Sequence, residues 1–225
     1  RLNQRNRVLN RVLRHNIRND MSVMQIHVDM LDEEADVAAD GSLDAIQRKI
    51  EEVVSTSEMA RRIDELQTDS IDDGPIDVVP LIEDRIGIVR SAHPEVRVSL
   101  DLPDEAWASV GPVFESVIDN LVENAIEHHD GDPSIDIVVE PGSGIHSSHR
   151  IIIADDGPGI PQEEVELLEK GDESQLEHSN GLGLWLVRWI VEYFGGNVQY
   201  EPRPSNGTRV VVEVPQAVER TPAAL

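Results

Sequence analysis

Two long stripes of apolar residues in the first 70 residues constrain the fold more than any other feature. In residues 2–31 and again in residues 43–66, apolar side chains recur at steps of three and four, the spacing of one helix face. Residues 36–42 lose this pattern and include Gly41. The sequence therefore predicts a helical hairpin in residues 1–71. Two helices alone cannot enclose a core, so we expect a homodimer in which two hairpins form a four-helix bundle.

A break in the pattern separates this hairpin from a second region. Residues 72–76 begin with Asp-Asp-Gly-Pro, which predicts a linker. Residues 77–216 alternate between strand-like and helical segments, which predicts an α/β sandwich with a mixed sheet and helices on one face, in an α+β chain. Residues 217–225 are expected to be a tail. The expected strands are Ile76–Val78, Val96–Leu100, Ser134–Glu140, Arg150–Ala154, Asn197–Glu201 and Thr208–Val214, and the expected helices are Pro80–Ala92, Pro112–His129 and Leu182–Phe194.

The charge of the chain is strongly negative. It has 44 acidic residues against 19 lysines and arginines, for a formal net charge of −25, and the acids are spread along the chain. Such a charge makes a compact state repel itself, and salt screens the repulsion because the Debye length falls to about 3 Å at 1 M. The composition favours a salt-rich, haloarchaeal cytoplasm over an acidic protein adapted to ordinary salt. It disfavours nucleic acid as a main partner, because phosphate backbones require a cationic surface.

Several absences narrow the class of protein further. The chain has no cysteine, which excludes disulfides, thiol nucleophiles and cysteine-bound metals. No apolar run approaches the roughly 20 residues that span a bilayer, and no signal peptide is visible. The chain opens on Arg1. We therefore expect the cytoplasmic C-terminal piece of a longer protein, without membrane contact of its own and with an upstream region that is membrane-bound or soluble.

The helix expected after Pro112 carries two asparagines that point to metal chemistry. Asn120 and Asn124 are four residues apart, so their side chains share one helix face. Amide oxygens are hard ligands that suit Mg²⁺, an ion that usually bridges substrate phosphates. Taken alone, the pair is better explained as two asparagines on a helix surface.

Two glycine-bearing segments add the features of a nucleotide site. An apolar strand runs into Asp155, followed by Gly157 and Gly159, which allow the backbone to turn tightly and approach a ligand. A carboxylate at a strand end can accept a hydrogen bond from an exocyclic amine such as that of adenine. Further on, Gly181 and Gly183 open directly into an apolar helix, whose N-terminal amides suit phosphate. Each segment alone also fits an ordinary turn.

In this order and spacing, the three segments resemble the ATP-binding domain shared by two-component histidine kinases, gyrases and mismatch-repair ATPases. The resemblance covers about residues 75–215 and includes Gly207-Thr208. It implies that Asn124, with Asn120, holds Mg²⁺ on the phosphates, that Asp155 binds the adenine amine, and that residues 161–180 form a lid over ATP. The nucleotide-binding residues so implied are Asn120, Asn124, His128, Asp155, Gly157, Gly159, Ile160, Gly181, Leu182, Gly183, Leu184 and Thr208.

The hairpin carries a candidate phosphoacceptor, His15. Residues 13–21 resemble, more loosely, the histidine box of sensor kinases. Imidazole is largely neutral and nucleophilic at neutral pH, and Arg11, Arg18 and Asn19 share its helix face. Arginines there can stabilise the charge of a phosphoryl group. The alternative is a solvated surface histidine whose neighbouring arginines pair with acids.

Two positions depart from the kinase pattern. Asn16 stands where related kinases carry an acid that acts as the base for phosphotransfer; either Asp20 replaces it or autophosphorylation is slow. Glu127 stands where many kinases carry a lysine, so a phosphate-binding cation is missing or comes from His128, His129 or an arginine. Asn19 matches a position that orients water for dephosphorylation of the partner in some members.

The sequence thus predicts a protein-histidine kinase core. It would phosphorylate His15 from Mg-ATP, with Arg18, Asn19 and Asp20 assisting, and pass the phosphoryl group to an aspartate on the receiver domain of a separate response regulator. A catalytically weak or inactive nucleotide-binding dimerisation scaffold is the alternative, suggested by the two departures. A gyrase-like clamp ATPase is disfavoured, because it requires a glutamate at the position of Asn120.

Overall fold

The structure is a computed structural model that describes residues 75–129, 131–144, 147–170, 182–203 and 206–217. The predicted hairpin and its four-helix bundle lie outside the described residues. So do the candidate phosphotransfer residues, which are His15, Arg18, Asn19 and Asp20.

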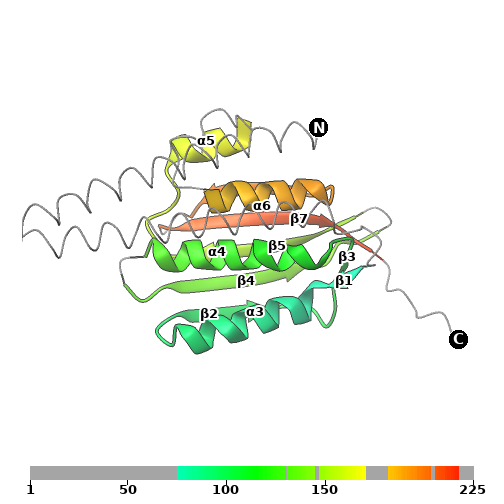
Figure 1. The fold of residues 1–225 in the computed structure, drawn as a ribbon, viewed down its shortest axis with the longest axis horizontal. Helices are drawn as coiled ribbons and strands as arrows, with labels where there is room; N and C mark the ends of the chain where they lie inside the picture. Colours follow the sequence, from blue (N-terminus) through cyan, green and yellow to red (C-terminus); the bar gives the residue numbers. More distant parts are fainter. Residues whose placement is uncertain (1–74, 130, 145–146, 171–181, 204–205, 218–225) are drawn as a thin grey trace, which may run out of the picture. The chain divides into compact units, whose positions relative to one another are not determined.

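A five-stranded mixed sheet is the framework of the described region (Figure 1). Its strand order is β2-β4-β5-β7-β6; β2 and β4 run parallel, and the other neighbours run antiparallel. A second, two-stranded antiparallel sheet pairs β1 with β3. The strands are β1 (Ile76–Asp77), β2 (Arg97–Asp101), β3 (Trp107–Ala108), β4 (Ser134–Glu140), β5 (Ser148–Asp155), β6 (Asn197–Pro202) and β7 (Thr208–Pro215).

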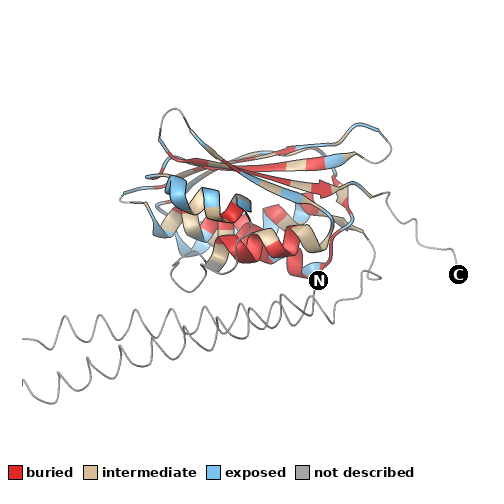
Figure 2. Cartoon of the chain, turned by 90° about the horizontal axis from the view of Figure 1, so that it is seen from above, coloured by how far each residue is buried: buried red, intermediate tan, exposed pale blue. Residues whose placement is uncertain are grey.

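Helices cover one face of the large sheet, as Figure 2 shows, and this arrangement confirms the predicted sandwich. They are α3 (Val78–Ala92), α4 (Glu115–Glu127) and α6 (Leu182–Tyr193); the 3-10 turn η2 (Pro112–Phe114) precedes α4, and α5 (Gln162–Lys170) follows β5. The helix-facing side of β4 buries Ile135, Ile137 and Val139, which alternate with partly exposed positions. The apolar stripe of α4 is buried as its spacing predicts: Val117, Ile118, Leu121, Val122 and Ala125.

A charged pair fixes α4 against α3. The guanidinium of Arg85 donates two hydrogen bonds to the carboxylate of Asp119, at 2.6 and 2.8 Å. Asp119 is buried, and its hydrogen bond raises the pKa of Arg85. A buried carboxylate is tolerated when such a two-pronged bond satisfies it. The rotation of α4 is thereby set, and with it the direction of its asparagine face.

The observed boundaries differ from the predicted ones for local reasons. Val78 begins α3 instead of ending a strand, because the Asp77 carboxylate caps that helix by accepting the Val79 N–H at 3.1 Å. The predicted helix 112–129 is a 3-10 turn followed by α4, and α4 ends at Glu127. Strand β3 was not predicted because two residues carry no periodicity. Helix α5 lies in residues expected to belong to the lid, and acids in its first turn suit a helix N-terminus.

The described residues show neither a membrane-spanning helix nor a ready-made metal cluster. None of their helices is long and apolar enough to cross a bilayer. They also contain no cluster of three or more acidic, histidine or cysteine side chains that could hold a metal ion by themselves.

Candidate functional site

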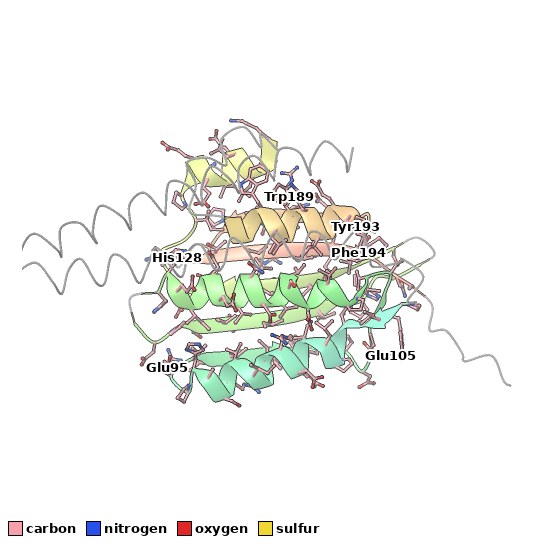
Figure 3. All side chains as sticks on the ribbon, in the orientation of Figure 1. Glu95, Glu105, His128, Trp189, Tyr193 and Phe194 are labelled. Atoms are coloured by element: carbon pink, nitrogen blue, oxygen red, sulfur yellow. The ribbon has the colours of Figure 1, made fainter. Side chains whose placement is uncertain are left out.

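The segments predicted to bind nucleotide meet at one end of the sheet. Figure 3 places His128 at one end of α4 and Tyr193 at the other end of the helical layer, so α6 begins where α4 finishes. The register pairs Asp155, the last residue of β5, with Ile135 near the start of β4. Strand β7 also starts here, since Arg209 pairs with Ala154. Segments far apart in the sequence therefore form one candidate site.

The carboxylate of Asp155 is held by the backbone and keeps one oxygen free. Its Oδ1 accepts hydrogen bonds from the N–H of Gly157 at 2.9 Å and of Thr208 at 3.3 Å. Its Oδ2 has no hydrogen-bond partner among the described residues. A carboxylate oxygen only accepts hydrogen bonds, so Oδ2 is preset for a donor from a ligand. The exocyclic amine of adenine is such a donor.

Glycines let three backbone segments approach one another around this carboxylate. Gly207 has a φ of +100°, and a Cβ there would overlap the carbonyl oxygen of Asp155. Gly159 has a φ of +85°, and its Cβ would lie 3.5 Å from the carbonyl oxygen of Gly207. Only glycine adopts such a backbone readily while allowing this approach. The two glycines pack the loop after β5 against the start of β7.

Thr208 completes this connection. Its N–H donates to Asp155, and its side-chain Oγ1 accepts the N–H of Ile160 at 3.1 Å. Thr208 is buried at the start of β7. The predicted site residues Asp155, Gly157, Ile160 and Thr208 therefore form one hydrogen-bonded unit, and Gly159 packs beside it.

The two asparagines of α4 have different surroundings. The Asn120 Nδ2 donates to the carbonyl of Ser116 at 2.7 Å, and its Oδ1 lies 2.8 Å from where a Cβ of Gly183 would stand. Asn120 thus faces the first turn of α6, where only a glycine leaves room for it. The half-buried Asn124 has a side chain without a hydrogen-bond partner among the described residues. Its amide oxygen is a free hard donor, which fits Mg²⁺.

The start of α6 is anchored from the sheet. The Tyr200 hydroxyl on β6 donates to the carbonyl of Leu184 at 3.2 Å, and burial raises the pKa of that hydroxyl, so it remains a neutral donor. The backbone amides at residues 182–184 are free of helix partners, because the first turn of a helix has none. That helix start suits phosphate oxygens. Gly181, also predicted in this site, lies outside the described residues.

The two histidines after α4 also differ. His129 contacts Asp156, with 3.3 Å between Nε2 and Oδ1, and its Nδ1 accepts the N–H of Gly131 at 2.9 Å. His128 is exposed at the end of α4 (Figure 3), close enough to Glu164 of α5 for its charge to oppose the pKa increase that burial causes there. His128 is therefore the more available of the two for a ligand phosphate.

Sequence reasoning missed one contact of this site. Arg203, in the hairpin between β6 and β7, donates to the main-chain carbonyl of Asp155 at 3.0 Å. Nothing in the local pattern marks this arginine, because its partner lies 48 residues away in the sequence. Its position four residues before Gly207 hints at the contact with Asp155, but only once the β6–β7 hairpin is known.

Comparison with known proteins shows which proteins this domain resembles. Residues 111–218 match the family model described as histidine kinase-, DNA gyrase B-, and HSP90-like ATPase. A curated relative, the sensor-type histidine kinase PrrB of Mycobacterium leprae, is 29% identical over 213 residues, covering 89% of this chain and 46% of that protein. The chain spans less than half the length of the curated relatives it matches. Residues 111–218 are therefore similar to ATPase domains of this type, and the curated relatives that the chain matches include sensor histidine kinases.

Solved structures agree at the level of the fold. The ATP binding domain of PrrB from Mycobacterium tuberculosis superposes with a TM-score of 0.53 at 23% identity, covering 64% of this chain and 97% of that one. The Acinetobacter baumannii histidine kinase AdeS gives a TM-score of 0.62 at 17% identity, covering 91% and 98%. At these identities the likeness concerns the fold alone.

Proposed function

We propose that the chain is the core of a sensor histidine kinase that moves the γ-phosphoryl group of ATP to His15. The observation that carries the proposal is the carboxylate of Asp155, which two backbone N–H groups orient while one oxygen stays free. Such an acceptor, set among glycines at a strand end, suits an adenine amine. The phosphoryl group would then pass to an aspartate on the receiver domain of a separate response regulator.

Different residues at this end of the sheet would bind the adenine, the phosphates and the metal ion. Asp155 would bind the adenine amine, and Gly157 and Gly159 would leave space for the base. The backbone amides that open α6, with His128, would hold the phosphates. Asn124 would hold Mg²⁺, with Asn120 as a second candidate ligand. When bound, Mg²⁺ neutralises charge on the phosphate oxygens, as in other phosphoryl-transfer sites.

The transfer step requires a nucleophile from the hairpin. An imidazole nitrogen of His15 would form the new bond to the γ-phosphorus as the bond between phosphorus and the departing ADP oxygen breaks. Arg18 would stabilise the charge of the moving group, and Asp20 is the nearest acid that can replace the base missing at Asn16. Asn19 would orient water for dephosphorylation of the partner. We propose that the hairpin supplies these groups as a homodimer, in a salt-rich cytoplasm where ATP is available.

A second candidate function is a nucleotide-binding scaffold without catalysis. It is favoured by Asn16 beside His15 and by Glu127 in place of a phosphate-binding lysine. A clamp ATPase is less favoured. Asn120 stands where that class needs a glutamate to activate water, and its amide nitrogen is engaged with the Ser116 carbonyl.

Labelling with γ-labelled ATP and Mg²⁺ in molar KCl separates the candidates. We expect acid-labile label on the intact chain, unchanged in the matched His27→Gln variant and abolished in His15→Gln. Label that survives in His15→Gln would exclude His15 as the acceptor. Tight ADP binding without any label would favour the scaffold.

A further inference from the structure

Arg203 links three strands behind the adenine-binding carboxylate. Its Nη1 donates to the main-chain carbonyl of Asp155 at the end of β5, at 3.0 Å. Its Nη2 lies 3.4 Å from Oδ2 of Asp136 on β4. The side chain itself comes from the β6–β7 hairpin and is 28% exposed. One planar guanidinium therefore spans the end of the sheet, and its fixed geometry suits two acceptors at once.

The carbonyl that Arg203 contacts belongs to Asp155, whose carboxylate must point in a fixed direction to accept the adenine amine. Gly207 lies directly against this carbonyl, and the hairpin is closed by the Arg203 N–H donating to the Gly207 carbonyl at 3.1 Å. The Asp155 peptide is therefore fixed by Gly207 on one side and by a guanidinium on the other. The peptide orientation sets where the side chain starts, and so it sets the direction of the free Oδ2.

We propose that Arg203 is a positioning residue for adenine recognition, acting through the main chain of Asp155. The proposal rests on the proposed nucleotide-binding function. Arg203 contacts no base itself; it holds the β5 terminus so that Oδ2 points at the exocyclic amine. Without Arg203, the Asp155 carbonyl loses its charged donor, and the end of β5 can tilt. Because a hydrogen bond depends on direction, this tilt misaligns the bond from the adenine amine to Oδ2.

The chain offers a matched control in Arg209. This arginine lies on β7 in the same hairpin and bonds Glu201 on β6 at 2.6 Å. No hydrogen bond or ion pair joins its side chain to Asp155 among the described residues. Loss of Arg209 removes one cation and one ion pair, as loss of Arg203 does, but leaves the Asp155 carbonyl bonded.

The test compares ADP with IDP, whose base carries a carbonyl in place of the exocyclic amine. Binding of both nucleotides to the intact chain is measured by calorimetry in molar KCl with Mg²⁺. Arg203→Ala should weaken ADP binding about tenfold, the loss of one well-aligned hydrogen bond to a charged group. IDP binding should stay within twofold, because the C6 carbonyl of IDP offers Oδ2 no hydrogen in place of the adenine amine. Arg203→Lys should retain most of the ADP preference, and Arg209→Ala all of it.

Each outcome decides between a positioning role and a merely structural one. Equal weakening of ADP and IDP by Arg203→Ala would overturn the proposal, since general loosening of the site affects both nucleotides. An unchanged ADP preference in Arg203→Ala would overturn it too. If the alanine variant fails to fold, loss of the ADP preference in Arg203→Lys, which keeps a cation at this position, would overturn it. Asp155→Asn reports on the proposed function separately: it should abolish the ADP preference whatever Arg203 does. A wild-type chain that binds ADP and IDP equally would overturn both proposals.

Discussion

The polar side chains at the two ends of strand β5 differ in how completely their hydrogen-bonding atoms are satisfied. At one end, His149 is buried, and both ring nitrogens face backbone partners: Nδ1 accepts the Gly142 N–H at 3.2 Å, and Nε2 lies 2.9 Å from the Trp107 carbonyl. Those partners require a neutral ring with its proton on Nε2. At the other end, Asp155 is equally well oriented but keeps an oxygen free. A polar group that is fully satisfied holds the fold, whereas one that is oriented and only partly satisfied is ready for a ligand.

The surroundings of the two ends support this distinction. The Trp107 carbonyl at the His149 end also accepts the Ala217 N–H at 2.7 Å, and the Ser147 hydroxyl donates to the Gln216 side chain at 2.6 Å. These bonds tie β3 and the residues after β7 to the β4–β5 hairpin. At the Asp155 end, Asn124 also lacks a hydrogen-bond partner among the described residues. Free hydrogen-bonding capacity therefore gathers where the candidate site lies.

The largest effect is expected from a methyl group at Gly207. Gly207→Ala places a Cβ on the Asp155 carbonyl oxygen in a backbone with positive φ, so the start of β7 must move away from β5. We expect a loss of about 3 kcal/mol in the free energy of unfolding, measured by denaturant titration, and ADP binding too weak to detect.

A matched control exists at the other end of β5. Gly144 also has a positive φ, +115°, but a Cβ there meets nothing within 4 Å. Gly144→Ala should therefore cost only about 1 kcal/mol, from backbone strain alone, and leave ADP binding intact. If both variants bound ADP like the wild type, close approach at Gly207 would not matter to the site.

An intermediate effect, confined to stability, is expected at the His149 end. His149→Phe keeps a ring of similar size but leaves the Gly142 N–H without its partner, and the Trp107 carbonyl keeps only its bond from the Ala217 N–H. We expect the free energy of unfolding to fall by about 2 kcal/mol, because a backbone donor that loses its partner away from bulk water is costly. ADP affinity should stay within twofold. The exposed His93, which pairs with Glu95 at 3.3 Å, provides the control: His93→Ala should change neither quantity measurably. Weaker ADP binding in His149→Phe would mean that the two ends are coupled.

Much of this fold follows from local patterns in the sequence. Alternation in Ser134–Glu140 predicted β4 with both its bounds, because every second residue must reach the core. His149 lies on the same face of β5 as Ile151 and Ile153, but the predicted strand began at Arg150, so its inward direction was not predicted. Its backbone partners were not predicted either, because they come from β3 and from the β4–β5 hairpin, whose positions depend on tertiary packing.

The candidate site was predictable as a set of residues but not as a division of roles. Spacing placed Asn120 and Asn124 on one helix face, yet it gave them the same role. Only the packing of α6 against α4 shows that Asn120 faces Gly183 while Asn124 stays free. The contact of Arg203 with Asp155 likewise depends on how a hairpin meets a distant strand end.

The smallest effect expected is a pH dependence in α5. Burial raises the pKa of Glu164, and the nearby His128 opposes this only in part. For an acid whose folded pKa is raised, the contribution to stability is present below the unfolded pKa, about 4.5, and is lost as pH rises through the folded pKa. Glu164→Gln cannot ionise, so it should be more stable than the wild type at pH 7, and this gain should vanish by pH 4. Thermal unfolding in molar KCl across that range measures the difference.

Glu166 on the same helix provides the opposite case. Its hydrogen bond from Lys170, at 3.0 Å, lowers its pKa, so its contribution is present above the unfolded pKa and is lost as pH falls. Glu166→Gln should therefore be slightly less stable than the wild type at pH 7 and equal to it in acid. If the two substitutions change stability at pH 7 in opposite directions, Glu164 resembles Asp155, because its surroundings only partly satisfy its carboxylate. If both substitutions instead stabilise the protein at pH 7, the cause is the large negative charge of the chain, because removing any acid then relieves repulsion.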